Sequence, residues 1–129
     1  MSKRGGFITL MSVIIMVAVA ASLAISVILM GVDSLRTGQS IEAANEATAI
    51  ADACAEESLE QIRVYNFIGT QNLTIGSGTC SYTITNDGGE NRTIEISAVA
   101  LSVTRRVRII TDVITPEIHI ATWQDVTSF

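Results

Sequence analysis

The side chains that most often perform catalysis or bind metal ions are scarce in this sequence of 129 residues. The single histidine, His119, lies between Ile118 and Ile120, and no serine or cysteine is placed beside it by a nucleophile motif. The two cysteines, Cys54 and Cys80, are too few for a structural zinc site. The residues therefore predict no catalytic group, no metal site and no cofactor, and we expect a protein that is not an enzyme.

A group of side-chain oxygens around residue 88 is the nearest approach to a calcium site. Its members are Asn86, Asp87, Glu90 and Asn91, and their spacing does not match a known calcium-binding motif. The asparagine, aspartate and paired glycines at positions 86–89 are instead a strong signal for a hairpin turn. We therefore expect a turn between two β-strands here.

Charge is distributed very unevenly along the chain. The 8 basic and 13 acidic residues give a net charge of −5, which argues against nucleic-acid binding. None of these residues lies between Gly5 and Val32. As a helix, the apolar run from Phe7 to Met30 is long enough to cross the roughly 30 Å hydrocarbon core of a membrane.

The charges that flank this run predict its orientation. Lys3 and Arg4 precede it, and the first charge after it is the acidic Asp33. Because basic residues accumulate on the cytoplasmic side, we expect the N-terminus in the cytoplasm and residues 33–129 outside. An unprocessed membrane anchor explains this pattern without further assumption. A secretory signal peptide cut after Ala20 is another alternative, although the apolar run continues for about ten residues beyond that point.

The junction just before the apolar run combines a very short basic leader, a terminal glycine and a phenylalanine, in the order Lys3-Arg4-Gly5-Gly6-Phe7. This combination resembles the type IV pilin-like family, which includes the pseudopilins of type II secretion. With the long helix and the β-rich region expected downstream, the resemblance covers the whole chain. It implies a leader of residues 1–6, cleavage between Gly6 and Phe7 by a prepilin peptidase, and N-methylation of Phe7.

One position departs from the family pattern. Family members that form the bulk of a filament usually carry glutamate at the fifth mature position, which is Met11 here. The lack of that glutamate resembles certain minor pilins and the largest of the minor pseudopilins, which are placed at or near the filament tip. The resemblance therefore implies a minor subunit.

The first half of the chain is expected to form one long helix. No proline occurs before Pro116, and residues 33–65 are rich in alanine, glutamate, isoleucine and leucine. We expect a helix from about Ile8 to about Tyr65, with residues 7–32 as its transmembrane and filament-core half and residues 33–65 as an amphipathic outer half. The apolar stripe of the outer half recurs every three or four residues, at Ile41, Ala44, Thr48, Ala51, Ala55, Leu59 and Ile62.

After Asn66 the apolar period changes from 3.6 to 2, which indicates β-strands. Glycines at positions 69, 76 and 78 mark a loose connecting stretch before them. The expected strands lie at about residues 80–85, 93–98, 104–114 and from 118 onward. We predict an α+β fold in which the long N-terminal helix packs on a four-stranded antiparallel sheet, as in pilin-like proteins. Residues 33–65 and 66–129 are expected to form one globular domain.

The two cysteines are placed to join the helix to the sheet. Cys54 lies beside the apolar stripe, and Cys80 opens the first strand. Both lie in the part of the chain expected outside the cytoplasm, where disulfides form and persist. The positions therefore predict a Cys54–Cys80 disulfide.

A candidate partner surface lies on the last two strands. Arg106 and Arg108 share one face of their strand, and Trp123 is expected on the outer face of the last strand, opposite Ile118 and Ile120. Such a patch would suit a partner subunit. The alternative is an exposed arginine row that prevents pairing at the sheet edge.

Together these features predict a minor pilin or pseudopilin subunit, assembled into a type IV pilus-like filament or its tip complex. The expected partners are other pilin subunits, contacted through the N-terminal helix, and the prepilin peptidase. We expect the chain in the cytoplasmic membrane before assembly and in a cell-surface filament afterwards. The alternatives are an unprocessed, single-span membrane-anchored extracytoplasmic binding domain and a secreted β-rich domain. Whether the filament serves adhesion, motility, DNA uptake or secretion stays open.

Overall fold

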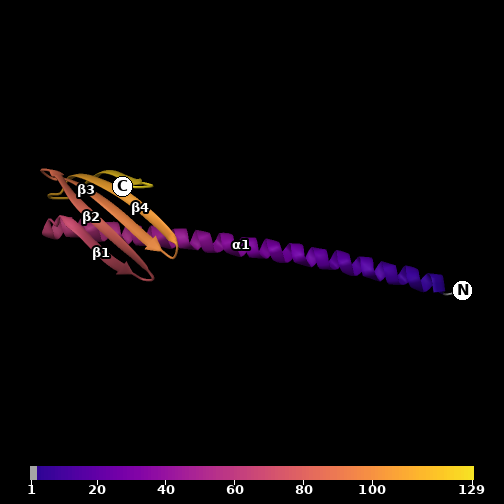
Figure 1. The fold of residues 1–129 in the computed structure, drawn as a ribbon. Helices are drawn as coiled ribbons and strands as arrows, with labels where there is room; N and C mark the ends of the chain where they lie inside the picture. The colour runs from indigo at the N-terminus through magenta and orange to yellow at the C-terminus, as the bar shows by residue number, and fades with distance from the viewer. Residues whose placement is uncertain (1–2) are drawn as a thin grey trace. The chain divides into compact units, whose positions relative to one another are not determined.

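The computed structural model describes residues 3–129, which form one helix and five strands (Figure 1). The elements are α1 (Lys3–Tyr65), β1 (Gly69–Ile75), β2 (Gly78–Gly88), β3 (Asn91–Ala100), β4 (Val103–Val113) and β5 (His119–Asp125). The chain divides into two compact units, residues 1–39 and residues 40–129. Helix α1 therefore belongs to both units, while all five strands belong to the second.

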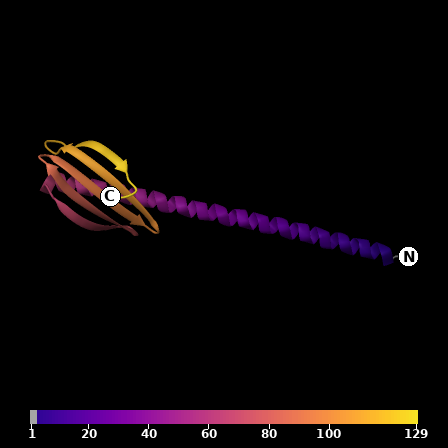
Figure 2. The ribbon, with the colours of Figure 1, turned by 45° about the horizontal axis from the view of Figure 1, so that its top comes forward.

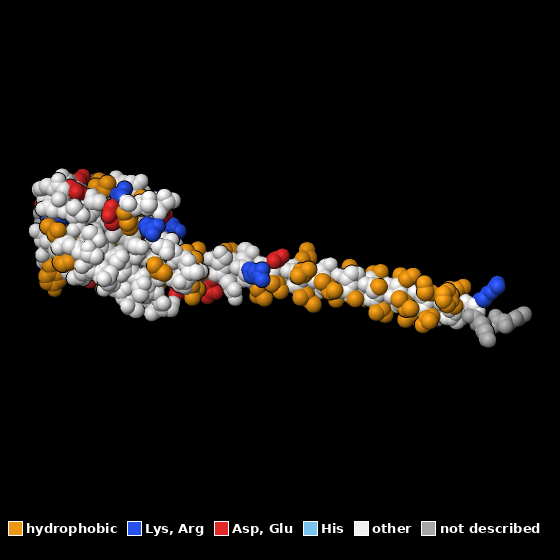
Figure 3. Space-filling view, viewed as in Figure 1, with side chains coloured by type: hydrophobic (Ala, Val, Ile, Leu, Met, Phe, Trp, Pro, Cys, Tyr) orange, Lys and Arg blue, Asp and Glu red, His pale blue; other side chains and the backbone are white. Residues whose placement is uncertain are grey.

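The first unit consists of the N-terminal part of α1. Every side chain from Arg4 to Gln39 is exposed, and most of these side chains are apolar (Figure 3). The hydroxyls of Thr9, Ser22 and Ser26 each donate to the carbonyl four residues earlier, at 2.8–2.9 Å. Helix α1 is long and apolar enough to cross a membrane. The hydroxyls of Thr9, Ser22 and Ser26 thus have partners within the helix, as polar groups in hydrocarbon require.

Helix α1 ends where the chain turns back toward the sheet. Asn66 adopts a left-handed backbone conformation with a φ of 48°, which asparagine tolerates better than most residues. The Asn66 amide donates to the Ile62 carbonyl at 3.0 Å, and the Phe67 amide donates to the Gln61 carbonyl at 3.3 Å. These bonds satisfy carbonyls that the last turn of a helix otherwise leaves without partners.

The five strands form one antiparallel sheet whose spatial order is the chain order, β1-β2-β3-β4-β5 (Figure 2). The hairpin turn expected at residues 86–89 connects β2 to β3. Gly88 and Gly89 have positive φ values of 114° and 57°, and the Gly88 amide donates to Asn86 Oδ1 at 2.9 Å. Because such a meander needs no crossover connection, one whole face of the sheet is available to a helix.

Residues 40–65 of α1 lie across one face of the sheet and form the core with it. The helix contributes small side chains, among them Ala47, Ala51 and Ala55, so its backbone can approach the strands closely. The sheet contributes larger side chains, of which the fully buried ones are Tyr82, Ile84, Ile94, Ile96 and Ile109. Each buried isoleucine contributes about 1.5–3 kcal/mol, so packing of the helix on these strands stabilises the second unit.

The expected fold class is confirmed: the protein is α+β, with a long N-terminal helix packed on an antiparallel sheet. Two details differ. The expected apolar stripe begins at Ile41, but that side chain is 57% exposed and the buried face of the helix begins at Ala43. The sheet has five strands rather than four, because residues 69–75, expected to be a loose connection, pair with β2 along its whole length.

The additional strand, β1, alternates half-buried and exposed residues. Leu73 and Ile75 pack against the core, which is why the segment joins the sheet. Threonine, glutamine and asparagine fill most of its other positions, so its apolar alternation is weak in the sequence. Gly69 has a φ of 137°, and a Cβ atom there would lie 3.3 Å from the Phe67 ring. Glycine therefore suits this position, because β1 begins in a backbone conformation that other residues rarely adopt and close to the Phe67 ring.

Candidate functional site

The Gly6–Phe7 junction lies in the first turns of α1. A Cβ atom added at Gly5 or Gly6 would meet nothing within 4 Å, although a glycine inside a helix costs about 1 kcal/mol relative to alanine. Packing within the described residues therefore does not call for glycine at either position. The Phe7 side chain is 64% exposed. Residues 1 and 2 of the expected leader lie outside the described residues.

Met11 lies about one helical turn beyond Phe7. Its side chain is 44% exposed. The nearest charged residues along α1 are Arg4 on one side and Asp33 on the other. The helix between these two residues has no carboxylate that could pair with a cation.

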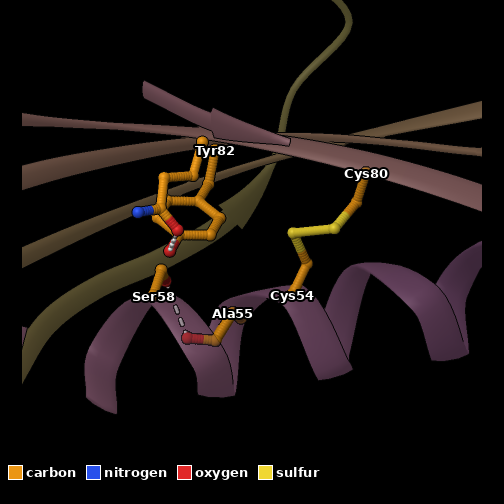
Figure 4. The surroundings of a disulfide bond; sticks show 6 residues. Cys54, Ala55, Ser58, Cys80 and Tyr82 are labelled. Carbon is orange, nitrogen blue, oxygen red and sulfur yellow. Dashed lines mark hydrogen bonds between the residues drawn. A yellow bond between two sulfur atoms is a disulfide. The ribbon is translucent and has the colours of Figure 1, made fainter. Parts of the chain in front are cut away.

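The predicted disulfide is confirmed and joins Cys54 of α1 to Cys80 of β2 (Figure 4). The two Cα atoms are 6.4 Å apart, and the bond spans a sequence separation of 26 residues. Both cysteines are buried. Chain-entropy estimates assign roughly 3–4 kcal/mol of stability to a loop of this size. The disulfide therefore holds the outer half of α1 on the sheet.

Tyr82 of β2 lies beside the disulfide and is fully buried (Figure 4). Its hydroxyl donates to Gln71 Oε1 on β1 at 2.9 Å. Burial raises the pKa of the Tyr82 phenol above its ordinary value of 10.0, and the negative charge of Glu57 on the facing helix raises it further. The phenol is therefore kept neutral and acts as a structural hydrogen-bond donor.

Arg106 and Arg108 lie on the face of β4 that points away from the helix, since they are opposite Ser97 and Glu95 of β3. Arg108 Nη2 is 3.0 Å from Glu95 Oε1, and its guanidinium lies 5.8 Å from the centroid of the Phe129 ring. Arg106 Nη1 donates to the backbone carbonyl of residue 127 at 2.8 Å. These contacts hold the C-terminal segment against β4.

Trp123 does not share this face with the two arginines. It is paired with Ile109, whose side chain is buried in the core. Because directly paired residues of antiparallel strands point to the same side, Trp123 lies on the helix side of the sheet. The irregular register between Ile110 and Thr111 changes the alternation along β5, so Trp123 differs from its expected outer position. The structure therefore does not bring the three residues of the expected partner surface together.

Arg92 of β3 is buried, at 4% exposure, and the sequence gives no direct signal of this. Its Nη1 donates to Asn86 Oδ1 and to the Gly89 carbonyl, each at 2.8 Å, and its Nη2 donates to Asn66 Oδ1 at 3.0 Å. The guanidinium thus ties the β2–β3 turn to the end of α1. Nothing in the sequence spacing indicates that Asn66 and Asn86 meet at one arginine.

The oxygen-rich β2–β3 turn is occupied by donors of the protein itself. Besides the bond from Arg92 to Asn86, the Thr93 hydroxyl donates to Asp87 and the Thr115 hydroxyl donates to Glu90. Within residues 3–129, no three histidine, cysteine, aspartate or glutamate side chains gather closely enough to bind a metal ion. The turn therefore works as a hairpin connection that is anchored to its surroundings.

His119 lies at the start of β5, where its Nδ1 is 2.6 Å from Asp112 Oδ1 of β4. Both side chains are largely exposed. The hydrogen bond from the imidazole holds the pKa of the Asp112 carboxyl below its ordinary value of 3.8. The pair therefore fastens the edge strand to β4.

No protein-family model matches the chain, and neither does any curated protein or any solved structure. The function must therefore be argued from the residues and their arrangement.

Proposed function

We propose that the chain is a minor pilin or pseudopilin subunit that assembles into a type IV pilus-like filament or its tip complex. The observation that carries the proposal is the order of three features along one chain. A short basic segment with two glycines, Lys3-Arg4-Gly5-Gly6, comes first. An uncharged and exposed helical stretch follows, and an antiparallel sheet covers the outer half of the same helix. Subunits of the pilin-like family combine these features in this order.

The glycines of the leader support processing at Gly6. Each weakens the helix, and neither is required by packing. A peptidase that must bind the chain in an extended form gains from such weak helical turns, and the absence of a side chain lets its backbone approach the bond before Phe7. We place the N-methyl group on the new amine of Phe7.

The exposed apolar half of α1 is suited to two environments in succession. The hydroxyls of Thr9, Ser22 and Ser26 have partners within the helix, so these polar groups can lie in lipid. Ala18, Ser22 and Ser26 form a line of small residues along which another helix can approach closely. The same segment therefore suits the cytoplasmic membrane first and the core of a filament of parallel helices afterwards.

Met11 supports a minor rather than a major role. A major subunit places an acid here for the N-terminal amine of its neighbour, and this chain can supply only the amine. Introducing the acid by Met11→Glu is expected to raise the frequency of the subunit in the filament shaft, measured by immunogold labelling. An unchanged frequency would mean that the missing acid does not determine where the subunit lies in the filament.

The intact mass of the chain purified from membranes tests the proposal. We expect a mature chain that begins at Phe7, with one added methyl group. The variant Gly6→Leu is expected to keep its leader, whereas Gly31→Leu, another helix glycine with open space around it, is expected to be processed normally. A start at Met1 or Ser2 in the unmodified chain would establish the unprocessed anchor instead. A start at Ala21 would establish cleavage by signal peptidase.

A further inference from the structure

Strand β1 lies at one edge of the sheet, and its one neighbour in the sheet is β2 (Figures 1 and 2). Its seven residues, Gly69–Ile75, include no charged side chain and no proline. Charged residues and proline are features by which proteins keep an exposed edge strand from pairing with another chain. The opposite edge has such charges, because β5 carries His119 and Asp125, which pair with Asp112 and Arg105. Strand β1 therefore lacks the protection that β5 has.

The centre of β1 carries the tripeptide Asn72-Leu73-Thr74. This tripeptide fits the acceptor pattern for an N-linked glycan, in which serine or threonine follows asparagine by two positions. Asn72 and Thr74 are exposed on the face of β1 that points away from the helix, whereas Leu73 packs against the core. Within residues 3–129, the side-chain hydrogen bonds of β1 are made by Thr70 and Gln71. The Asn72 amide and the Thr74 hydroxyl are therefore available to a modifying enzyme.

A second tripeptide of the same pattern, Asn91-Arg92-Thr93, opens β3 and has different surroundings. The Thr93 hydroxyl donates to Asp87. Arg92 is buried, and its guanidinium is bonded to the β2–β3 turn. Strand β3 also lies between β2 and β4, so it cannot leave the sheet without separating two pairs of strands. The structure thus distinguishes two tripeptides of the same sequence pattern, and it favours Asn72 as the acceptor.

A hollow of about 320 Å³ lies beside Asn72 on the outer face of the sheet. Its lining residues are uncharged and include Asn72, Thr74, Thr79, Ser81, Ser97 and Val99. Ser81 is paired with Asn72 on one side and with Ser97 on the other, so hydroxyl groups extend from Asn72 across the neighbouring strands. Hydroxyls both donate and accept hydrogen bonds, as the hydroxyls of a sugar do. The hollow can therefore hold the first sugar of a glycan attached to Asn72.

We propose that Asn72 carries an N-linked glycan whose first sugar lies over Ser81 and Ser97 and which shields the free edge of β1. The Asn72 amide nitrogen attacks the anomeric carbon of a sugar carried on a polyprenyl phosphate or diphosphate. The N–C bond forms while the C–O bond to the lipid phosphate breaks; the released phosphate keeps the electron pair of that bond, and the amide nitrogen gives up one proton. The inference rests on the proposed function for the location of the second unit outside the cytoplasm, where such acceptors are modified.

The position of β1 makes this modification compatible with the fold. Because β1 pairs with β2 alone, a transferase can bind it before it joins the sheet, or after it detaches, while the other strands stay paired. The glycan projects from the outer face, so Leu73 can still pack against the core. A bulky, hydrated glycan at the centre of the edge hinders another chain from approaching to about 4.8 Å, the spacing of paired strands.

The mass of the full-length chain, purified from the membranes of its native cells, tests the inference. We expect the unmodified sequence to carry the added mass of one or more sugar residues, and fragmentation of the peptide is expected to place that mass on Asn72. Asn72→Gln and Thr74→Ala are each expected to lose the added mass completely. Thr74→Ser is expected to retain it, because serine keeps the hydroxyl. The matched control, Asn91→Gln, is expected to retain it as well.

Three results would overturn the inference: a chain without sugar, sugar on Asn91, or an added mass that persists in Asn72→Gln. The two proposals can fail separately, because the start of the chain and Asn72 lie in different peptides. A start at Phe7 with an unmodified Asn72 would exclude the glycan and leave the proposed function standing. A glycan on Asn72 of a chain that begins at Met1 or Ser2 would support the glycan and overturn the processing.

A further pair of variants tests the shielding of the edge. Asn72→Gln and Asn72→Lys both remove the acceptor, but lysine places a charge on the edge strand instead. After gentle warming in detergent, Asn72→Gln is expected to scatter light at least tenfold more than the glycosylated chain, whereas Asn72→Lys is expected to stay dispersed. Circular dichroism before warming checks that both variants are folded. Equal scattering by the glycosylated chain and Asn72→Gln, or by the two variants, would mean that the glycan does not shield β1.

Discussion

The two halves of α1 are rich in alanine, isoleucine and leucine, yet they differ in surroundings. From Arg4 to Gln39 every side chain is exposed, whereas between Ala43 and Ile62 one side of the helix is buried under the sheet. Residues 40–65 carry six acidic residues, at positions 42, 46, 52, 56, 57 and 60, and residues 5–32 carry none. The two halves of α1 therefore differ in the placement of their charges more than in helix propensity. Charges give the outer half a face for water, and the first half has an apolar surface all round.

Stability has a different source in each half. The outer half is held by a core and a disulfide within its own chain. The side chains of residues 4–39 are all exposed, so no core within the described residues stabilises this half, which is long and apolar enough to cross a membrane. Substitutions should therefore affect one half and leave the other unchanged.

The largest effect is expected from a charge in the first half. Replacing Leu23 by aspartate changes the cost of membrane insertion by about 3–4 kcal/mol. We expect Leu23→Asp to be lost from the membrane fraction after carbonate extraction. Ala49→Asp, an exposed change in the outer half, should be retained like the unmodified chain. Equal retention of both variants would contradict a lipid-spanning role for the first half.

The next largest effect is expected from removing the disulfide. Replacing both Cys54 and Cys80 by alanine should lower the free energy of unfolding of the second unit by about 3 kcal/mol. Urea titration in detergent, followed by the fluorescence of Trp123, measures this change. Thr79→Ala, next to the bond but exposed, should shift the midpoint little. Membrane retention should be unchanged, and a loss of retention would show that the two halves are coupled.

A smaller effect is expected at Tyr82. Its phenylalanine variant loses the bond to Gln71, which is worth about 1 kcal/mol. Because burial raises the pKa of Tyr82 in the folded state, its contribution to stability is present below pH 10.0 and is lost as the pH rises through the higher folded value. Tyr82→Phe should reduce this alkaline loss, measured by urea titration at several pH values. Tyr65→Phe, at an exposed position, should retain it.

The smallest effect is expected at the sheet edge. Because His119 holds the pKa of Asp112 below 3.8 in the folded state, the contribution of the pair is present above that pH and is lost as the pH falls through the lower folded value. His119→Ala should reduce this acid dependence in thermal melts between about pH 2 and 5. The same acid dependence in both proteins would mean that the pair does not hold β5.

Most of the architecture could be predicted from two periodicities. The uncharged run and the stripe beyond it indicated α1, and alternation after Asn66 indicated the strands. Strand β1 was missed because polar residues fill it, although Leu73 and Ile75 pack on the core. A strand of this kind is decided by tertiary contacts that local pattern does not contain.

The candidate site could be predicted in part. The positions of Cys54 and Cys80 sufficed for the disulfide, because each lies in a strongly patterned element. The side of the sheet on which Trp123 lies could not be predicted, because one irregular pair at Ile110 reverses the alternation. The burial of Arg92 could not be predicted for another reason. Its partners lie in two segments, the β2–β3 turn and the end of α1, which meet only after the sheet has packed on the helix.

The strand order of the sheet bears on how the protein is made. Since β1 to β5 are neighbours in space in the order in which they are synthesised, each strand can pair with the one before it as soon as it emerges. No strand has to wait for a later one or be inserted between two others, and contacts between near neighbours in sequence form fastest. The helix, which emerges first, is already available as the surface on which this growing sheet collapses.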